Sequence, residues 1–285
     1  MASASRPPLP ARDGISPQKV MLSGRVPDFP GYVAGEAGDS PFTVGERLAP
    51  GTVLAKPVPA WFHPVVPPEP VIPYTHEVLH EDADLIVVDK PHFLPSTTNG
   101  RIIRETVQTR LRVQFDEDDI VPLHRLDRLT AGVLICSRRR GTRGAYQQLF
   151  QDRAVRKTYR ARVVGEPTVG RSFEFVRLRM RKEAGRRQVL VDDHGTRTET
   201  AARRVGDDVL ELAPLTGHTH QLRVVLNHLG TPIVGDDTYP VDRGLPLYDF
   251  SSPLHLLATG VSFTDPLTGE HRVFRSGRDL PARVG

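Results

Sequence analysis

The stretch that decides the fold is "VPLHRLDRLTAGVLICSRRR", residues 121–140. Its first half places Asp127 between Arg125 and Arg128, and its second half is an apolar run that ends at Cys136. An apolar run of this length predicts a buried strand. The carboxylate in front of the strand has two explanations. It is either a structural tie that pairs with arginine or with loop amides, or an ionised group held in place for chemistry.

Composition sets the outer limits of the interpretation. The chain has 285 residues, of which 38% are hydrophobic and 25% charged, and this balance is typical of a soluble globular protein with one large or two ordinary domains. Cys136 is the only cysteine, so no internal disulfide is expected and its role is packing. The sequence shows no secretory signal and no apolar run of about 20 residues. These features predict a cytoplasmic protein without a membrane segment.

Charge is unevenly distributed along the chain. Residues 138–187 contain sixteen Lys or Arg and four Asp or Glu, a net charge of +12 for this block. The whole chain carries +4, so the remaining residues carry −8. A concentration of positive charge predicts a basic face and a polyanionic partner.

The first quarter of the chain differs from the rest. Fifteen of the 26 prolines lie in residues 1–75, where no regular helix or strand period is visible. Because proline fixes backbone angles and removes hydrogen-bond donors, residues 1–74 are predicted to be an irregular arm or a small module with a linker at about 64–74. Regular patterns begin at residue 75 and define a second domain, 75–285.

The second domain is predicted to be strand-rich. Strands are expected on both sides of the acidic turn in residues 78–91, and alternating apolar positions recur from residue 157 to 214, with a last hairpin in 254–276. Helices are expected at 105–115, 144–152 and 218–230, the last with an apolar stripe that begins at Leu222. The fold class is therefore α+β with a largely antiparallel or mixed sheet.

Four separated stretches resemble one family in the order in which that family carries them. They are "DADLIVVDKPHFLP", "HRLDRLTAG", "KTYRARVVG" and "LAPLTGHTHQLRVVLNHLGTPIVGDDTY". Together they are similar to the RluA-type RNA pseudouridine synthases over residues 75–275. His124 favours this branch, because the related RsuA-type branch has glycine there. A kinase catalytic loop is excluded, because Leu126 interrupts its pattern and no glycine-rich phosphate loop precedes it.

The resemblance gives the flanked carboxylate a chemical role. It implies that the protein isomerises uridine to pseudouridine in RNA without a cofactor, and that Asp127 is the catalytic aspartate. An ionised carboxylate could attack the sugar as a nucleophile or remove a proton as a base. The sequence leaves both routes open. A neighbouring guanidinium would favour the ionised form.

The same match assigns roles to other residues. Arg223 is expected to form an ion pair with Asp127, and Tyr159 to stack on the target uracil. Arg125 is a candidate for filling the gap left by the extruded base, and Arg128 either contacts phosphate or ties down the loop. The full set of expected substrate-binding residues is Arg125, Arg128, His124, Thr130, Lys157, His220 and Gln221.

Other features of the match remain open. Lys90 lies at a recurrent family position, but a lysine at a strand end explains it equally well. His218 stands where the family often has arginine and Ala131 where it often has serine. The segment 44–55 could be a remnant of the S4-type RNA-binding module that many relatives carry. No metal site is expected, because neither the histidines of 218–228 nor the acidic run 116–119 has a complete ligand set.

The predicted partner is RNA, with ribosomal RNA favoured over transfer RNA, and the predicted state is a monomer. Two other classes of function remain as alternatives. The chain could be an RNA-binding or assembly factor on the same fold, or an enzyme that cleaves a nucleoside or glycoside with Asp127. The last class commonly uses two carboxylates, and no second one stands out.

Overall fold

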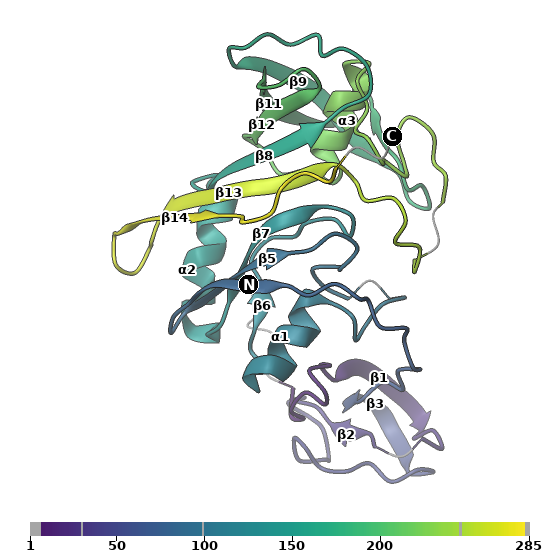
Figure 1. Ribbon diagram of the computed structural model, residues 1–285. Helices are drawn as coiled ribbons and strands as arrows, with labels where there is room; N and C mark the ends of the chain where they lie inside the picture. The colour runs from purple at the N-terminus through teal and green to yellow at the C-terminus, as the bar shows by residue number, and fades with distance from the viewer. Residues whose placement is uncertain (1–6, 30, 99, 245–246, 283–285) are drawn as a thin grey trace.

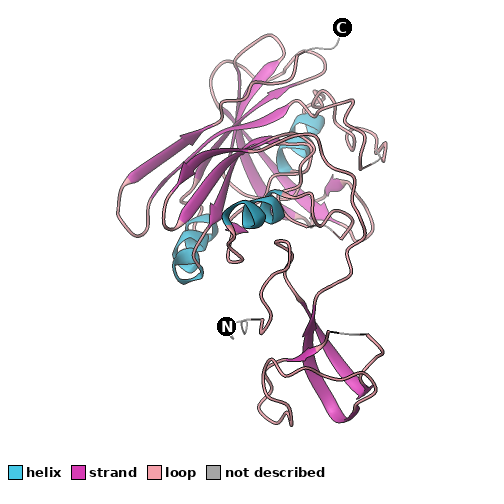
Figure 2. Ribbon diagram, turned by 60° about the horizontal axis from the view of Figure 1, so that its bottom comes forward, coloured by secondary structure: helices cyan, strands magenta, loops and turns pink. Residues whose placement is uncertain are grey.

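The computed structural model describes residues 7–29, 31–98, 100–244 and 247–282. Most of these residues build one long twisted sheet with helices against it, and a small separate β-module lies at the opposite end from helix α3 (Figures 1 and 2). The long sheet has eleven strands in the order β10-β9-β11-β12-β8-β13-β7-β5-β4, with β14 on β13 and β6 on β7. All of its pairs are antiparallel except β7 with β13. The predicted strand-rich α+β fold is confirmed.

The strands follow the sequence patterns closely within the second domain. The expected strand–turn–strand of residues 78–91 is β4 (Glu77–Glu81) and β5 (Leu85–Lys90). The remaining strands of the long sheet are β6 (Val121–Pro122), β7 (Ala131–Ser137), β8 (Arg156–Arg162), β9 (Glu174–Lys182), β10 (Val189–Val191), β11 (Thr196–Arg204), β12 (Val209–Pro214), β13 (Leu256–Thr264) and β14 (His271–Arg275).

Strands β5 and β7 lie in the centre of the core and are buried along their whole length. Successive side chains point to opposite faces, so Val133 and Ile135 pack with Leu85 and α2-side residues such as Tyr146. Leu134 and Cys136 face the larger cluster on the other side, together with α1 and α3 residues. A strand covered on both faces needs a continuous apolar sequence, which explains the run that ends at Cys136.

Three helices cover the sheet. Helix α1 (Val107–Phe115) begins at Thr106, whose side chain accepts a hydrogen bond from the Thr109 amide at 3.1 Å. Helix α2 spans Arg140–Gln151 and starts four residues before the expected range. Helix α3 spans Gln221–His228, so residues 218–220 precede it as a loop instead of forming its first turn.

Residues 18–62 contain strands where proline spacing alone gave no strand pattern. They are β1 (Gln18–Arg25), β2 (Val33–Ala34) and β3 (Val53–Phe62), paired in the order β1-β3-β2. The module has its own small core around Leu22, Leu48 and Val58. Within its described residues there is no helix, and the segment 44–55, the possible S4-type remnant, is a loop up to residue 52 and the start of β3 from Val53.

The segment between the module and the sheet is fastened to the second domain. The Glu69 carboxylate accepts hydrogen bonds from the successive amides of Ile103, Arg104 and Glu105 at 2.7–3.2 Å. Glu105 in turn accepts from the Ile72 amide at 2.7 Å. The proline-rich linker is therefore ordered against the chain just before α1.

The sharpest steric constraint is the approach of β13 to the start of β7. Gly132 has φ +112°, and a Cβ atom placed there would lie 2.2 Å from the carbonyl oxygen of Ala258. Side chains are excluded both by that contact and by the backbone angle. The loop that carries Asp127 ends at this point, so its position depends on Gly132.

Replacing Gly132 with alanine should destabilise the protein by about 3 kcal/mol, because left-handed strain and overpacking each cost about 1–3 kcal/mol. Urea unfolding followed by circular dichroism measures the change. The matched control is Gly144→Ala in helix α2, where nothing lies within 4 Å of the added Cβ. That variant should be neutral or slightly more stable; equal stability of the two variants would contradict the steric argument.

Candidate active site

The loop that carries Asp127 is held by its backbone. Four successive carbonyl groups, those of residues 126–129, each accept a hydrogen bond. The Leu126 carbonyl accepts from the Ser96 hydroxyl at 2.9 Å, and the Asp127 carbonyl from the Thr130 amide at 3.0 Å. The other two accept from the Lys90 ammonium group (3.3 Å to Arg128) and from His92 Nδ1 (2.6 Å to Leu129). Residues 90–96 therefore clamp the Asp127 loop.

Lys90 is the buried centre of this clamp. Its Nζ also donates to the carbonyls of Pro91 and Leu94 at 2.9 and 2.7 Å, and its side chain is fully buried. Burial lowers the pKa of Lys90 well below its usual value, while the nearby charge of Asp127 acts in the opposite direction. Lys90 is thus more than a strand-end lysine, because its nitrogen fixes the loop.

The clamped loop forms one wall of a cleft of about 530 Å³, called the main cleft below. Asp127 lies in this wall with 27% of its side chain exposed. Tyr159, from β8, lines the same cleft and is 9% exposed. Burial, and then the charge of Asp127, raise the pKa of the Tyr159 hydroxyl above its usual value, so the phenol stays neutral. Leu222 and Leu256 add apolar surface beside it.

Arg223 lies near Asp127, but its hydrogen bonds to carboxylates go to two other residues. Its guanidinium donates to Asp236 through Nε at 2.8 Å and Nη2 at 2.5 Å, and to Asp237 through Nη2 at 2.6 Å. Its Nη1 lies 3.8 Å from Asp127 Oδ2. The expected pairing of Arg223 with Asp127 is therefore a longer contact than the two buried ones. Burial acts to lower the pKa of Arg223, but the hydrogen bonds and charge of Asp236 outweigh it and raise this pKa.

His220 connects the same groups from the loop before α3. Its Nε2 lies 3.8 Å from Asp127 Oδ2, and its Nδ1 lies 3.2 Å from the Tyr239 hydroxyl. Its backbone adopts a left-handed conformation with φ 57°. Burial lowers the pKa of His220, although Asp127 opposes this shift. A neutral imidazole fits these contacts if its Nε2 accepts from Arg223 Nη1 at 3.4 Å and its protonated Nδ1 donates to the Tyr239 hydroxyl oxygen.

His124 and Thr130 shape the ends of the loop. The Ile135 amide donates to His124 Nε2 at 3.1 Å, so the ring proton is on Nδ1. The ring stacks on Phe150 with centroids 5.2 Å apart. Burial, with the charge of Lys157, lowers the pKa of His124 to about 3. Thr130 is buried and closes the turn with its amide.

The other expected substrate-binding residues divide into two groups. Arg125 and Lys157 line the main cleft, and their side chains make no hydrogen bond or ion pair to any described residue, so their charges are available to a ligand. Arg128 donates to the Leu247 carbonyl at 3.0 Å, which supports its loop-tying role. Gln221 is buried, and its amide bonds to Thr216, His218, Glu199 and Thr200. Its side chain therefore shapes the cleft wall.

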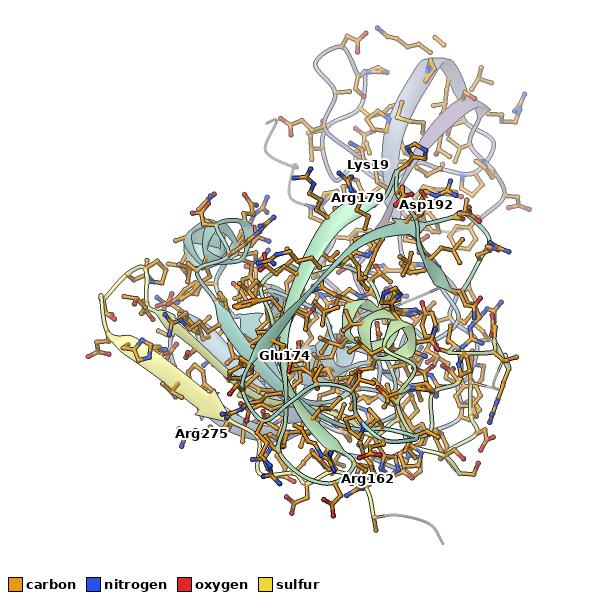
Figure 3. The ribbon with its side chains drawn as sticks, turned by 90° about the horizontal axis from the view of Figure 1, so that it is seen from above. Lys19, Arg162, Glu174, Arg179, Asp192 and Arg275 are labelled. Carbon is orange, nitrogen blue, oxygen red and sulfur yellow. The ribbon has the colours of Figure 1, made fainter. Side chains whose placement is uncertain are left out.

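The basic block 138–187 does not form one face. Its side chains are spread along the sheet, as Arg162 and Arg179 show in Figure 3, and many of them pair with acids from elsewhere. Arg138 pairs with Glu81 and Glu117, and Arg162 with Asp208. The main cleft itself gathers four cations, two of them from outside the block: Arg125, Arg153, Lys157 and Arg197. Sequence clustering therefore located the positive site only in part.

Several residues of the site had no predicted role. His92, Asp236, Asp237 and Tyr239 lie in stretches that carry the family resemblance, and Ser96 directly follows the first of these stretches, but their partners are distant in sequence. The one signal in the sequence was the pair of adjacent carboxylates in "GDDTY", which follows a helix that contains an arginine and could have indicated an ion pair between them. Among the described residues, no group of three or more His, Cys, Asp or Glu could hold a metal ion. No helix in the described ranges is long and apolar enough to cross a membrane.

Comparison with known proteins assigns the class. Residues 84–228 match the family model described as RNA pseudouridylate synthase. The chain belongs to this family and to its RluA-type branch. It is 32% identical over 208 residues to the dual-specificity RNA pseudouridine synthase RluA of Vibrio vulnificus, covering 69% of this chain and 80% of that protein.

Longer relatives and solved structures agree. The pseudouridylate synthase RPUSD2 of Homo sapiens is 36% identical over 181 residues, which are 62% of this chain and 32% of that protein. The chain thus matches about a third of this longer relative. The solved structure of human RNA pseudouridylate synthase domain containing 1 superimposes with a TM-score of 0.57 at 25% identity, covering 74% of this chain and 86% of that one.

Substitution of Arg223 should cost stability as well as function. Arg223→Gln would leave Asp236 buried without its countercharge and Asp237 paired with Arg187 alone, and loss of one partner from a buried ion pair costs about 3–5 kcal/mol. Urea unfolding measures this loss. Arg160→Gln, on the exposed side of β8, is the control and should change stability little. If the two variants unfold together, the buried network contributes less than its geometry indicates.

The depressed pKa of His124 should appear as pH-dependent stability. The unfolded chain binds a proton near pH 6.5, whereas the folded chain does so only near pH 3, so this residue's contribution is present above pH 6.5 and is lost as pH falls toward 3. His124→Gln should flatten the fall in unfolding free energy below pH 6.5. His271→Gln, on exposed strand β14, is the control. Unchanged slopes in the His124 variant would refute the assignment.

Proposed function

We propose that the protein isomerises uridine to pseudouridine in RNA, with Asp127 as the catalytic carboxylate. One observation carries the proposal. Among the described residues that line the main cleft, Asp127 is the only Asp or Glu, and it shares the cleft with the aromatic ring of Tyr159 and four Lys or Arg side chains. A single carboxylate, an apolar platform and phosphate-binding cations are what the reaction requires.

The chemistry needs no other reactive group. The bond between uracil N1 and ribose C1′ breaks, the base turns, and a new bond joins C1′ to C5, so that the C5 proton is lost and N1 gains one. An ionised carboxylate can promote the first step by attacking C1′ or by taking the proton from C2′. Asp127 is partly exposed and has the Arg223 and His220 nitrogens at 3.8 Å, which supports either route.

Tyr159 is proposed to support the base. A nucleotide flipped out of an RNA strand is recognised by stacking and by hydrogen bonds to its edges. Tyr159 is surrounded by Leu222 and Leu256, and its neutral hydroxyl makes no hydrogen bond to a described residue. It is therefore available to the base, including the proton at C5. Arg125 and Lys157 would bind the flanking phosphates.

The alternatives fit the cleft less well. Glycoside-cleaving enzymes commonly use two carboxylates that flank the bond, whereas the described lining of the main cleft supplies one. A binding factor without catalysis would not require an ionisable side chain clamped by four hydrogen-bonded carbonyls. Ribosomal RNA is the favoured substrate in this proposal, and transfer RNA is the alternative. The enzyme is proposed to be a cytoplasmic monomer whose activity resides in the domain 75–285.

Asp127→Asn should reduce the rate of pseudouridine formation by about a thousandfold or more, since substitution of side chains that act directly in catalysis causes losses of this size. The test is pseudouridine mapping by carbodiimide sequencing of total RNA from cells that lack the protein and are complemented with each form. The unmodified protein should restore the mark at particular uridines, and Asp127→Asn should not.

The matched control is Asp193→Asn, because Asp193 is an exposed aspartate in the turn between β10 and β11. It should restore the mark fully. Thermal melting checks that both variants fold. Restoration by Asp127→Asn, or no uridine that depends on the protein, would overturn the proposal.

A further inference from the structure

A second cavity of about 650 Å³ borders the Asp127 loop and adjoins the main cleft. Its walls come from the clamp segment, the loop itself, the turn between β9 and β10, and the region around α3. Four residues line both cavities: Arg125, Leu126, Asp127 and His220. Asp127 therefore stands at the junction of the two cavities.

The second cavity is more strongly positive than the main cleft and has a different chemical character. Two carboxylates line it, those of Asp127 and Asp237. Neither Phe, Tyr nor Trp is among its described lining residues, in contrast to the main cleft with Tyr159 and Phe150. It is lined by six cationic side chains: Arg125, Arg128, Lys182, Arg186, Arg187 and Arg223.

The turn between β9 and β10 is a fixed wall of this cavity. Arg187 is held by ion pairs with Asp237, at 2.5 Å, and with Asp242. Gln188 donates to the Thr238 carbonyl at 2.8 Å, and Lys182 donates to the Arg187 carbonyl at 2.9 Å. These contacts give the turn a defined position next to Asp127.

Arg186 is the cation on this wall that remains free to bind a ligand. It lies at the tip of the turn with 59% of its side chain exposed, and its ion-pair partner among the described residues is the neighbouring Glu183 at 3.1 Å. An exposed pair of this kind contributes little to stability. An anion in the cavity could therefore take the guanidinium from Glu183 at small cost.

We propose that the second cavity is a phosphodiester subsite, which holds the backbone of the RNA strand next to the target uridine. The inference rests on the proposed function, because it requires the target ribose at Asp127 and the uracil in the main cleft. The strand then continues past Asp127 into a cavity rich in guanidinium groups, which match phosphate geometry. The base and its neighbouring phosphate are thus recognised in two cavities that meet at one carboxylate.

The test compares two arginine variants in RNA binding. Arg186→Gln removes a charge from the second cavity, and Arg160→Gln removes one from the exposed side of β8, away from Tyr159 on the alternate face. The probe is a short fluorescein-labelled oligouridylate, and fluorescence anisotropy gives Kd over a series of KCl concentrations. Each phosphate contact with a single strand contributes about 0.7 to the slope of log K against log salt.

Arg186→Gln should lower that slope by about 0.7 and weaken binding by about tenfold at low salt, while Arg160→Gln should leave both unchanged. Equal slopes for the two variants would overturn the subsite. Melting temperatures confirm that both fold. This readout is binding, so it is independent of catalysis. If pseudouridine formation depends on Asp127 but the two slopes are equal, only the proposed subsite is refuted. If no pseudouridine depends on the protein, the proposed function is refuted.

Discussion

The structure depends on the hydrogen bonds that residues 90–96 and Thr130 make to four successive carbonyls of the Asp127 loop. Charged loops on a protein surface are ordinarily mobile, because their backbone groups can form hydrogen bonds with water in place of fixed partners in the protein. Here each carbonyl from Leu126 to Leu129 has a partner inside the protein, and Gly132 then fixes the loop against β13. The catalytic role proposed for Asp127 requires a carboxylate that is positioned to within a fraction of an ångström, and a backbone held in this way provides that precision.

The distribution of carboxylates around Arg223 explains why Asp127 is the accessible one. Asp236 and Asp237 have side chains only 1% and 6% exposed and take the short hydrogen bonds. Asp127 is 27% exposed and lies at the longer distance of 3.8 Å. The two buried carboxylates hold the guanidinium in place, so its charge acts on Asp127 without covering it. A shorter, bidentate pair would occupy the oxygens that the proposed reaction needs.

The sequence predicted features that depend on local patterns. The apolar run of β7, the amphipathic helix α1 and the α+β class were all visible as periodicity, and Asp127 and Tyr159 were brought into one cleft as the family resemblance implied. Features that depend on distant contacts were missed or only partly predicted. The start of α3, the internal role of Gln221 and the dispersion of the basic block were set by tertiary partners. Prolines likewise concealed the strands of residues 18–62.

The position of the N-terminal module limits what it can contribute. The residues that precede its first strand contact the second domain near α1, where Arg112 donates to the Ser16 hydroxyl at 2.7 Å and Asp118 accepts from the Ala11 amide at 2.7 Å. Helix α3 lies at the opposite end of the molecule in both views (Figures 1 and 2). No described residue before Pro95 lines either cavity. Under the proposed function, the module would therefore contact RNA only outside the reacting nucleotide, and the loop, the β9–β10 turn and α3 would contact that nucleotide's immediate neighbours.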